Sequence, residues 1–147
     1  MLDELEDWQA PRALVVSGAN RSSVLWIVSE IARSLRDAGW RVEIGNAVTG
    51  GLPPPPDYDA IVIVVSAWAR WRAIAQYVEW FRDSLAELPV VIVLAGTRID
   101  ADRFCARALR FRPSIAFSVE NSSCALRTAT RVATELIALH ARAKLTA

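Results

Sequence analysis

Apolar residues recur along this chain in two patterns, as short continuous runs and as stretches with a helical period. Continuous runs of about five residues predict strands that are buried on both faces of a sheet. Such runs predict strands over Ala13–Ser17, Ala60–Val65 and Val90–Leu94. Two further strands are predicted: the short Arg41–Ile44, with Val42 and Ile44 on one side, and Ser114–Val119, where the apolar run is interrupted. The helical period predicts helices over Ser22 or Ser23 to Ala38, about Arg72–Glu87, Asp100 to about Leu109, and about Ala125–Ala143.

Strands that alternate with amphipathic helices predict an α/β fold, in which a parallel sheet carries helices on both faces. Five strands in 147 residues fit a three-layer sandwich with the strand order 2-1-3-4-5. We see no sign of a second domain, so residues 1–147 are predicted to form one domain, with residues 1–12 as an acidic lead-in. A ligand of such a sheet is expected beyond the carboxyl ends of the strands, at the switch point between strands 1 and 3.

The composition is that of a globular protein and narrows the classes of function. Hydrophobic residues make up 53% of the chain, and the net charge of +1 gives no general attraction to nucleic acid. No apolar run approaches the roughly 18–20 residues that span a bilayer. The N-terminal MLDELEDWQA is acidic and lacks the basic-then-apolar order of a signal peptide, which favours a cytoplasmic protein.

Cysteine and histidine are too scattered to predict a metal site. Cys105 and Cys124 have neither a CxxC spacing nor a neighbouring histidine in the sequence. His140, the only histidine, lies late in the last predicted helix. We therefore expect no metal, and we expect both cysteines to be small apolar fillers.

The chain lacks the residues that characterise two other classes of phosphate-binding protein with such sheets. The phosphate loop of nucleotide hydrolases needs a lysine, and this chain has no lysine before Lys144. A response-regulator receiver needs an aspartate at the end of strand 3, where this chain has Val65 and Ser66.

Three loops are expected to meet at the carboxyl edge of the sheet: Ser17–Ser23, Ser66–Trp71 and Ala95–Arg98. The first loop leads into a helix, whose free N–H groups and positive macrodipole end suit a phosphate. Further hydrogen-bond donors and a positive charge come from Ser17, Asn20, Arg21, Ser22 and Ser23. The same residues also fit an ordinary capped turn, because a hydroxyl at an N-cap needs no ligand.

The second and third loops offer an aromatic surface and a small-residue turn. Trp68 suits stacking on a flat ring such as an isoalloxazine or a base, and it fits equally well as a cover for the following helix. Gly96 and Thr97 offer backbone N–H groups and a hydroxyl near the same point, or simply an ordinary turn.

From Arg12 to about Gly96 the chain resembles flavodoxins. The resemblance rests on ALVVSGANRSSVLWIVSEIARSLRDAGWRVEI, on DYDAIVIVVSAWARWRAIAQYVEWFRDSLAELPVVIVLAG, and on the spacing between them. Within that family the chain looks most like the flavodoxin-domain group of menaquinone-dependent protoporphyrinogen dehydrogenases, with a degenerate phosphate loop. The resemblance covers a little over half of the chain, and the last third matches only in the order of strands and helices.

This resemblance implies a flavodoxin-like three-layer sandwich that binds flavin mononucleotide (FMN). The loop after strand 1 would hold the phosphate, the loop after strand 3 would pack against the flavin ring, and the loop after strand 4 would complete the pocket. The residues implied to bind the cofactor are Ser17, Gly18, Asn20, Arg21, Ser22, Ser23, Ser66, Ala67, Trp68, Gly96 and Thr97.

Two functions from different classes follow. The first is an FMN-binding redox protein, either an electron carrier or a flavin-dependent oxidoreductase, that serves a redox partner or a small-molecule acceptor. The alternative is a flavodoxin-like module that has lost FMN and acts as a protein-binding or assembly domain. Arg21 favours this alternative, because it stands where flavodoxin loops usually have a glycine. Trp26, Trp71 and Trp80 are candidate interface residues, and such a surface fits a homodimer.

Overall fold

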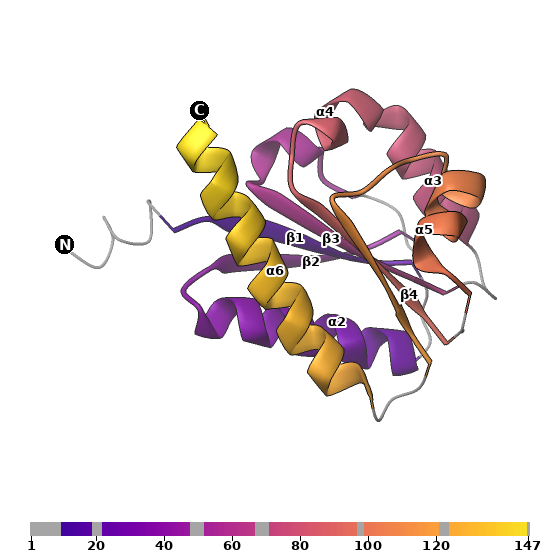
Figure 1. Ribbon diagram of the computed structural model, residues 1–147, viewed down its shortest axis with the longest axis horizontal. Helices are drawn as coiled ribbons and strands as arrows, with labels where there is room; N and C mark the ends of the chain where they lie inside the picture. Colours follow the sequence, from indigo (N-terminus) through magenta and orange to yellow (C-terminus); the bar gives the residue numbers. More distant parts are fainter. Residues whose placement is uncertain are drawn as a thin grey trace.

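The computed structural model describes residues 10–18, 22–47, 52–66, 71–96, 99–120 and 124–146. Five parallel strands form one sheet in the order β2-β1-β3-β4-β5, as predicted (Figure 1). The strands are β1 (Arg12–Ser17), β2 (Arg41–Asn46), β3 (Ala60–Ser66), β4 (Val90–Ala95) and β5 (Ile115–Val119). The helices are α2 (Ser22–Asp37), α3 (Trp71–Trp80), α4 (Arg82–Ala86), α5 (Ala101–Phe104) and α6 (Ala125–Thr146), with a 3-10 turn η1 (Pro55–Asp57) and a π-helical turn η2 (Cys105–Leu109).

Successive residues of the central strands point to opposite faces of the sheet, and both faces are buried. Ala13 and Val15 pack toward α2 and α6, whereas Leu14 and Val16 pack toward α3, α4 and η2. Figure 1 shows the resulting three layers, with α2 and α6 on one side of the sheet and α3, α4 and α5 on the other. Every residue of β3 and β4 is buried, which explains why these strands are continuous apolar runs.

Gly39 ends α2 in the way its position in the sequence predicts. Its φ of +92° is left-handed, its N–H donates to the carbonyl of Arg36, and the Trp40 N–H donates to the carbonyl of Leu35. These two bonds form a Schellman motif. The turn buries Trp40, whose ring meets the imidazole of His140 on α6 edge-on at 5.0 Å.

Two predicted helices differ from their observed forms. The helix expected over about Arg72–Glu87 is divided at Phe81, whose φ of −117° and ψ of 24° are not helical. The helix expected to run to Leu109 changes to π geometry at Cys105 and ends at Arg110, which has a φ of +50°. Apolar residues continue at helical spacing through both changes, so the hydrophobic pattern does not reveal them.

The proline-rich segment returns the chain from β2 to β3 across the face that carries α3. The Tyr77 hydroxyl donates to the carbonyl of Pro53 at 3.0 Å, and Pro55 is buried in η1. Burial raises the pKa of Tyr77 to about 12, so this phenol stays protonated and remains a donor. Within the described part of the segment, from Leu52 onward, the prolines therefore act as a packed spacer.

Candidate functional site

The candidate site lies at the carboxyl edge of the sheet, where β1, β3 and β4 end. Ser17 pairs with Val64 of β3, while β3 continues to Ser66, which pairs with Ala95 of β4. The chain leaves β1 toward β2 on one side and later returns to β3 on the other. This is the switch point at which ligands of open α/β sheets bind.

Ser17 and Ser66 are the buried polar residues at this edge, with exposed fractions of 0% and 3%. The carbonyl of Ser17 accepts a hydrogen bond of 2.9 Å from the Ala47 N–H, which joins β1 to the segment after β2. Both serines have interaction partners within the fold. Because both side chains are buried, a ligand at this edge would not meet them at the surface.

Gly18 is required by packing. Its N–H donates to the carbonyl of Val64 at 2.8 Å, so the chain stays close to β3 as it leaves β1. A Cβ at this position would lie 2.9 Å from Cγ1 of Ile74, a buried residue of α3. The glycine thus lets α3 pack against the beginning of the loop, independently of any ligand.

Three long helices begin at this edge without a carboxylate in the first turn: α2, α3 and α6. Their free N–H groups and positive dipole ends are therefore not neutralised from within the first turn. Arg72 and Arg127, both exposed, add positive charge to the first turns of α3 and α6. These three helix starts are electrostatically suited to an anion, whereas α5, which begins after β4, carries Asp100 and Asp102 at its start.

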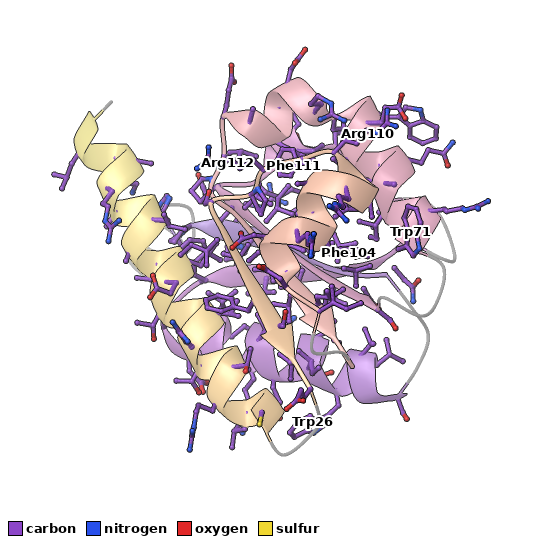
Figure 2. All side chains as sticks on the ribbon, turned by 45° about the vertical axis from the view of Figure 1, so that its right-hand side comes forward. Trp26, Trp71, Phe104, Arg110, Phe111 and Arg112 are labelled. Atoms are coloured by element: carbon purple, nitrogen blue, oxygen red, sulfur yellow. The ribbon has the colours of Figure 1, made fainter. Side chains whose placement is uncertain are left out.

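Gly96 is exposed where β4 ends. Its φ is +78°, its N–H donates to the carbonyl of Val119 at 2.7 Å, and a Cβ built on it would have no atom within 4 Å. On the face of the sheet that carries α3 and α5, Trp71 and Phe104 meet edge-on with their ring centroids 6.2 Å apart, which joins the two helices (Figure 2). Trp71 is half-buried in this contact, so it serves as packing.

The structure places the predicted site residues in two groups. Ser17, Gly18, Ser22, Ser66 and Gly96 are described and lie at the ends of β1, β3 and β4 or at the start of α2. Ser23 belongs to α2, and its side chain is not described. Asn20, Arg21, Ala67, Trp68 and Thr97 lie outside the described residues.

The two cysteines differ in their surroundings. Cys105 is buried, and this burial raises the pKa of its thiol to about 12, so it is an unreactive filler as predicted. Cys124 is exposed, and the prediction that it fills the core is wrong, because it precedes α6 at the surface.

The candidate interface tryptophans also differ in how far they are exposed. Trp80 and Trp26 have exposed fractions of 70% and 42%, whereas Trp71 packs against Phe104. Trp26 lies on α2 near the beginning of α6 (Figure 2).

In the described part of the chain, no helix combines the length and the apolar character needed to cross a membrane.

No protein family and no curated protein matches the sequence. Solved structures do match the fold. A flavodoxin of Streptococcus pneumonia TIGR4 is 18% identical, with a TM-score of 0.58 over 86% of this chain and 98% of that chain. The diflavin flavoprotein A3 of Nostoc sp. is 16% identical, with a TM-score of 0.66 over 93% and 97%. The general stress protein 14 of Treponema denticola, solved in complex with FMN, is 11% identical, with a TM-score of 0.53 over 90% and 99%.

The chain therefore has a flavodoxin-like α/β fold. The sheet order, the helices on both sides and these structural neighbours agree on this class. At such low identity the likeness extends to the fold alone.

Proposed function

We propose that the protein binds FMN at the carboxyl edge of the sheet and uses it in redox chemistry, as an electron carrier or a flavin-dependent oxidoreductase. The observation that carries the proposal is the start of α2, α3 and α6 at this edge with no carboxylate in any first turn. A dianionic phosphate is stabilised by such helix ends. Support also comes from structural neighbours, one of which was solved with FMN.

The described residues fit a flavin phosphate and ring. The first-turn N–H groups of α2, together with Ser22, would face the phosphate. Asn20, Arg21 and Ser23 would add donors, and an arginine can bind phosphate with two parallel hydrogen bonds. At the end of β4, a side chain at Gly96 would meet open space, and this space would suit a flat ring.

The remaining predicted residues would shape the ring pocket. Trp68 would stack on the ring, while Ala67 and Thr97 would border it. Ser17 and Ser66, which are buried at the ends of β1 and β3, would hold the starts of the two loops in place. Gly18 would let the first loop stay close to β3.

When bound, FMN would supply the electron chemistry through its isoalloxazine ring. The part of the chain would be to bind and orient the cofactor and to exclude water from one face of the ring. No side chain needs to act as an acid or base. A narrower form of the proposal, a role like that of the menaquinone-dependent protoporphyrinogen dehydrogenases, rests on the sequence resemblance described above.

The proposal is tested by the visible absorption of the purified protein, before and after addition of FMN and gel filtration. We expect retained bands near 370 and 450 nm. A fluorescence titration should show FMN binding more tightly than riboflavin, and the double substitution Asn20→Ala/Ser23→Ala should remove that preference. If the double variant keeps the full preference, the assignment of the phosphate loop is wrong.

The position of the ring has a separate test. Trp68→Ala should raise the Kd for FMN by about five- to 150-fold, since stacking on an aromatic ring is worth about 1–3 kcal/mol. Trp80→Ala is the matched control, because Trp80 is exposed on the last turn of α3. Equal Kd values for the two variants would show that Trp68 does not stack on the ring.

A cofactor-free binding module is the second candidate function. It is favoured by Trp80 and Trp26, which expose large apolar side chains on α3 and α2. A protein that remains colourless after incubation with FMN would support this module and contradict the redox proposal.

A further inference from the structure

A second surface feature lies away from the candidate FMN site, on the face of the sheet that carries α3, α4 and α5. It is a hollow of about 600 Å³, lined by Asp102, Ala106, Arg110, Phe111, Arg112 and Pro113. We call it the basic groove. Figure 2 shows Arg110, Phe111 and Arg112 together beyond the helix that carries Phe104.

The charges of the basic groove are largely unpaired. Residues 100–113 contain four arginines and two aspartates. Among the described residues, ion pairs form only between Arg12 and Glu43 and between Arg33 and Glu30, so the guanidinium groups of Arg110 and Arg112 have none. Asp102 also lines the groove, and it offsets part of this positive charge.

The backbone holds Arg110 in place. The π-helical turn ends at Arg110, whose left-handed φ of +50° is uncommon for a residue with a side chain. Its carbonyl accepts a hydrogen bond from the guanidinium of Arg82 on α4. Phe111 between the arginines is buried and gives the groove an apolar floor.

We propose that the acidic segment at the start of this chain, residues 2–8, docks in the basic groove of the same molecule. The segment reads LDELEDW and carries four carboxylates and no basic residue. Leu2, Leu5 and Trp8 alternate with these charges. An acidic segment with apolar side chains is complementary both to the arginines and to the floor formed by Phe111, Ala106 and Pro113.

A series of contacts along the amino edge of the sheet leads from β1 to the groove. Arg12, which opens β1, stacks on the ring of Tyr58 at 5.2 Å, next to η1. The turn η1 packs against α4, whose Arg82 bonds the carbonyl of Arg110. The groove is thus reached from β1 without crossing to the other face of the sheet.

The length of the segment is sufficient for this path. β1 and β5 are three strand spacings apart, about 14 Å at the usual spacing of parallel strands. Nine residues before Ala10 reach at most about 30 Å when extended. The segment can therefore cross the edge and still place several residues in the groove.

The test uses hydrogen exchange of the backbone amides of residues 3–9, followed by NMR in the full-length protein. We expect these amides to exchange about tenfold more slowly in the parent protein than in Arg110→Glu/Arg112→Glu. The charge-matched control is Arg72→Glu/Arg127→Glu, two exposed arginines at the other edge, which should leave the protection intact. High salt should remove the protection, because the attraction is between exposed charges.

A compensating variant distinguishes the loss of docking from a folding defect. Reversing the acidic residues with Glu4→Arg/Glu6→Arg/Asp7→Arg in the Arg110→Glu/Arg112→Glu background should restore protection. Equal exchange in the parent protein and in Arg110→Glu/Arg112→Glu would overturn the proposal. So would protection that falls on dilution of the protein, because the segment would then be docking on a second copy.

Discussion

Gly18 illustrates how a residue that resembles part of a ligand loop can be required by the fold. Its N–H is bonded to β3, and the space for its Cβ is taken up by Ile74. In the sequence, this glycine is indistinguishable from one that lets a phosphate approach the backbone. The contact with α3 becomes visible only when the strands and helices are assembled.

A side chain at position 18 should therefore destabilise the protein even without cofactor. We expect Gly18→Ala to lower the free energy of unfolding by about 1–3 kcal/mol, as overpacked cores do, and Gly18→Leu to lower it further. The measurement is urea unfolding followed by circular dichroism.

Gly96 provides the control for this prediction. Unlike Gly18, Gly96 has a positive φ, so Gly96→Ala has a backbone cost of about 1 kcal/mol or more, but its Cβ would meet open space. Gly96→Leu should therefore cost little more than Gly96→Ala. If alanine and leucine destabilise position 18 equally, the clash with Ile74 is not the cause.

At the scale of elements, α6 is attached to the turn after α2 through one pair of rings. His140 on α6 meets Trp40 edge-on, and its Nε2 is buried without a hydrogen-bond partner among the described residues. Desolvation by burial lowers the pKa of His140, Asp59 acts in the opposite direction, and Lys144 reinforces the lowering. The folded protein therefore favours the neutral imidazole.

This shift predicts a loss of stability on mild acidification. Just below pH 6.5 the unfolded chain binds a proton on this histidine more readily than the folded chain does, so the free energy of unfolding falls as the pH falls. We expect urea unfolding midpoints to decrease between pH 7.5 and 5.5. His140→Phe, which keeps a ring against Trp40, should flatten that decrease, and an unchanged pH dependence in this variant would exclude His140 as its source.

The elements also show which parts of the fold could be predicted from the sequence. β1, β3 and β4 are buried on both faces, so burial alone produces their apolar runs, and the sheet order follows from their alternation with helices. The division at Phe81 and the π-helical turn at Cys105 depend on local backbone geometry within an unchanged apolar period. A hydrophobic pattern reports which side of a helix is buried, and it carries no information about such changes.

The candidate site was predictable to the same extent. Its place at the strand ends follows from topology, and Ser17, Gly18, Ser66 and Gly96 lie there as expected. The absence of carboxylates in the first turns of α2, α3 and α6 can be read in the sequence once the helix starts are known. The burial of Ser17 and Ser66 depends on tertiary packing, and the residue types alone do not specify it.

At the scale of the whole molecule, both layers of the core are built on the same sheet. One layer packs against α2 and α6 and the other against α3, α4 and η2, and every strand of the centre contributes to both. Unfolding one layer would expose strands that the other layer needs. The two layers should therefore unfold together, and a ligand bound at the edge of the sheet should stabilise the entire chain.

FMN binding, if it occurs as proposed, should consequently raise the temperature of global unfolding. At a free FMN concentration of about one hundred times Kd, linkage adds about 2.7 kcal/mol to the free energy of unfolding, which corresponds to a shift of roughly 10 °C for a chain of this size. Far-ultraviolet and near-ultraviolet circular dichroism should report the same shifted midpoint, because both core layers share the sheet. Riboflavin at the same concentration should give a smaller shift, since it lacks the phosphate that the helix starts would stabilise. An unshifted midpoint in millimolar FMN would contradict the FMN site, and a shift in only one of the two signals would contradict the joint unfolding of the layers.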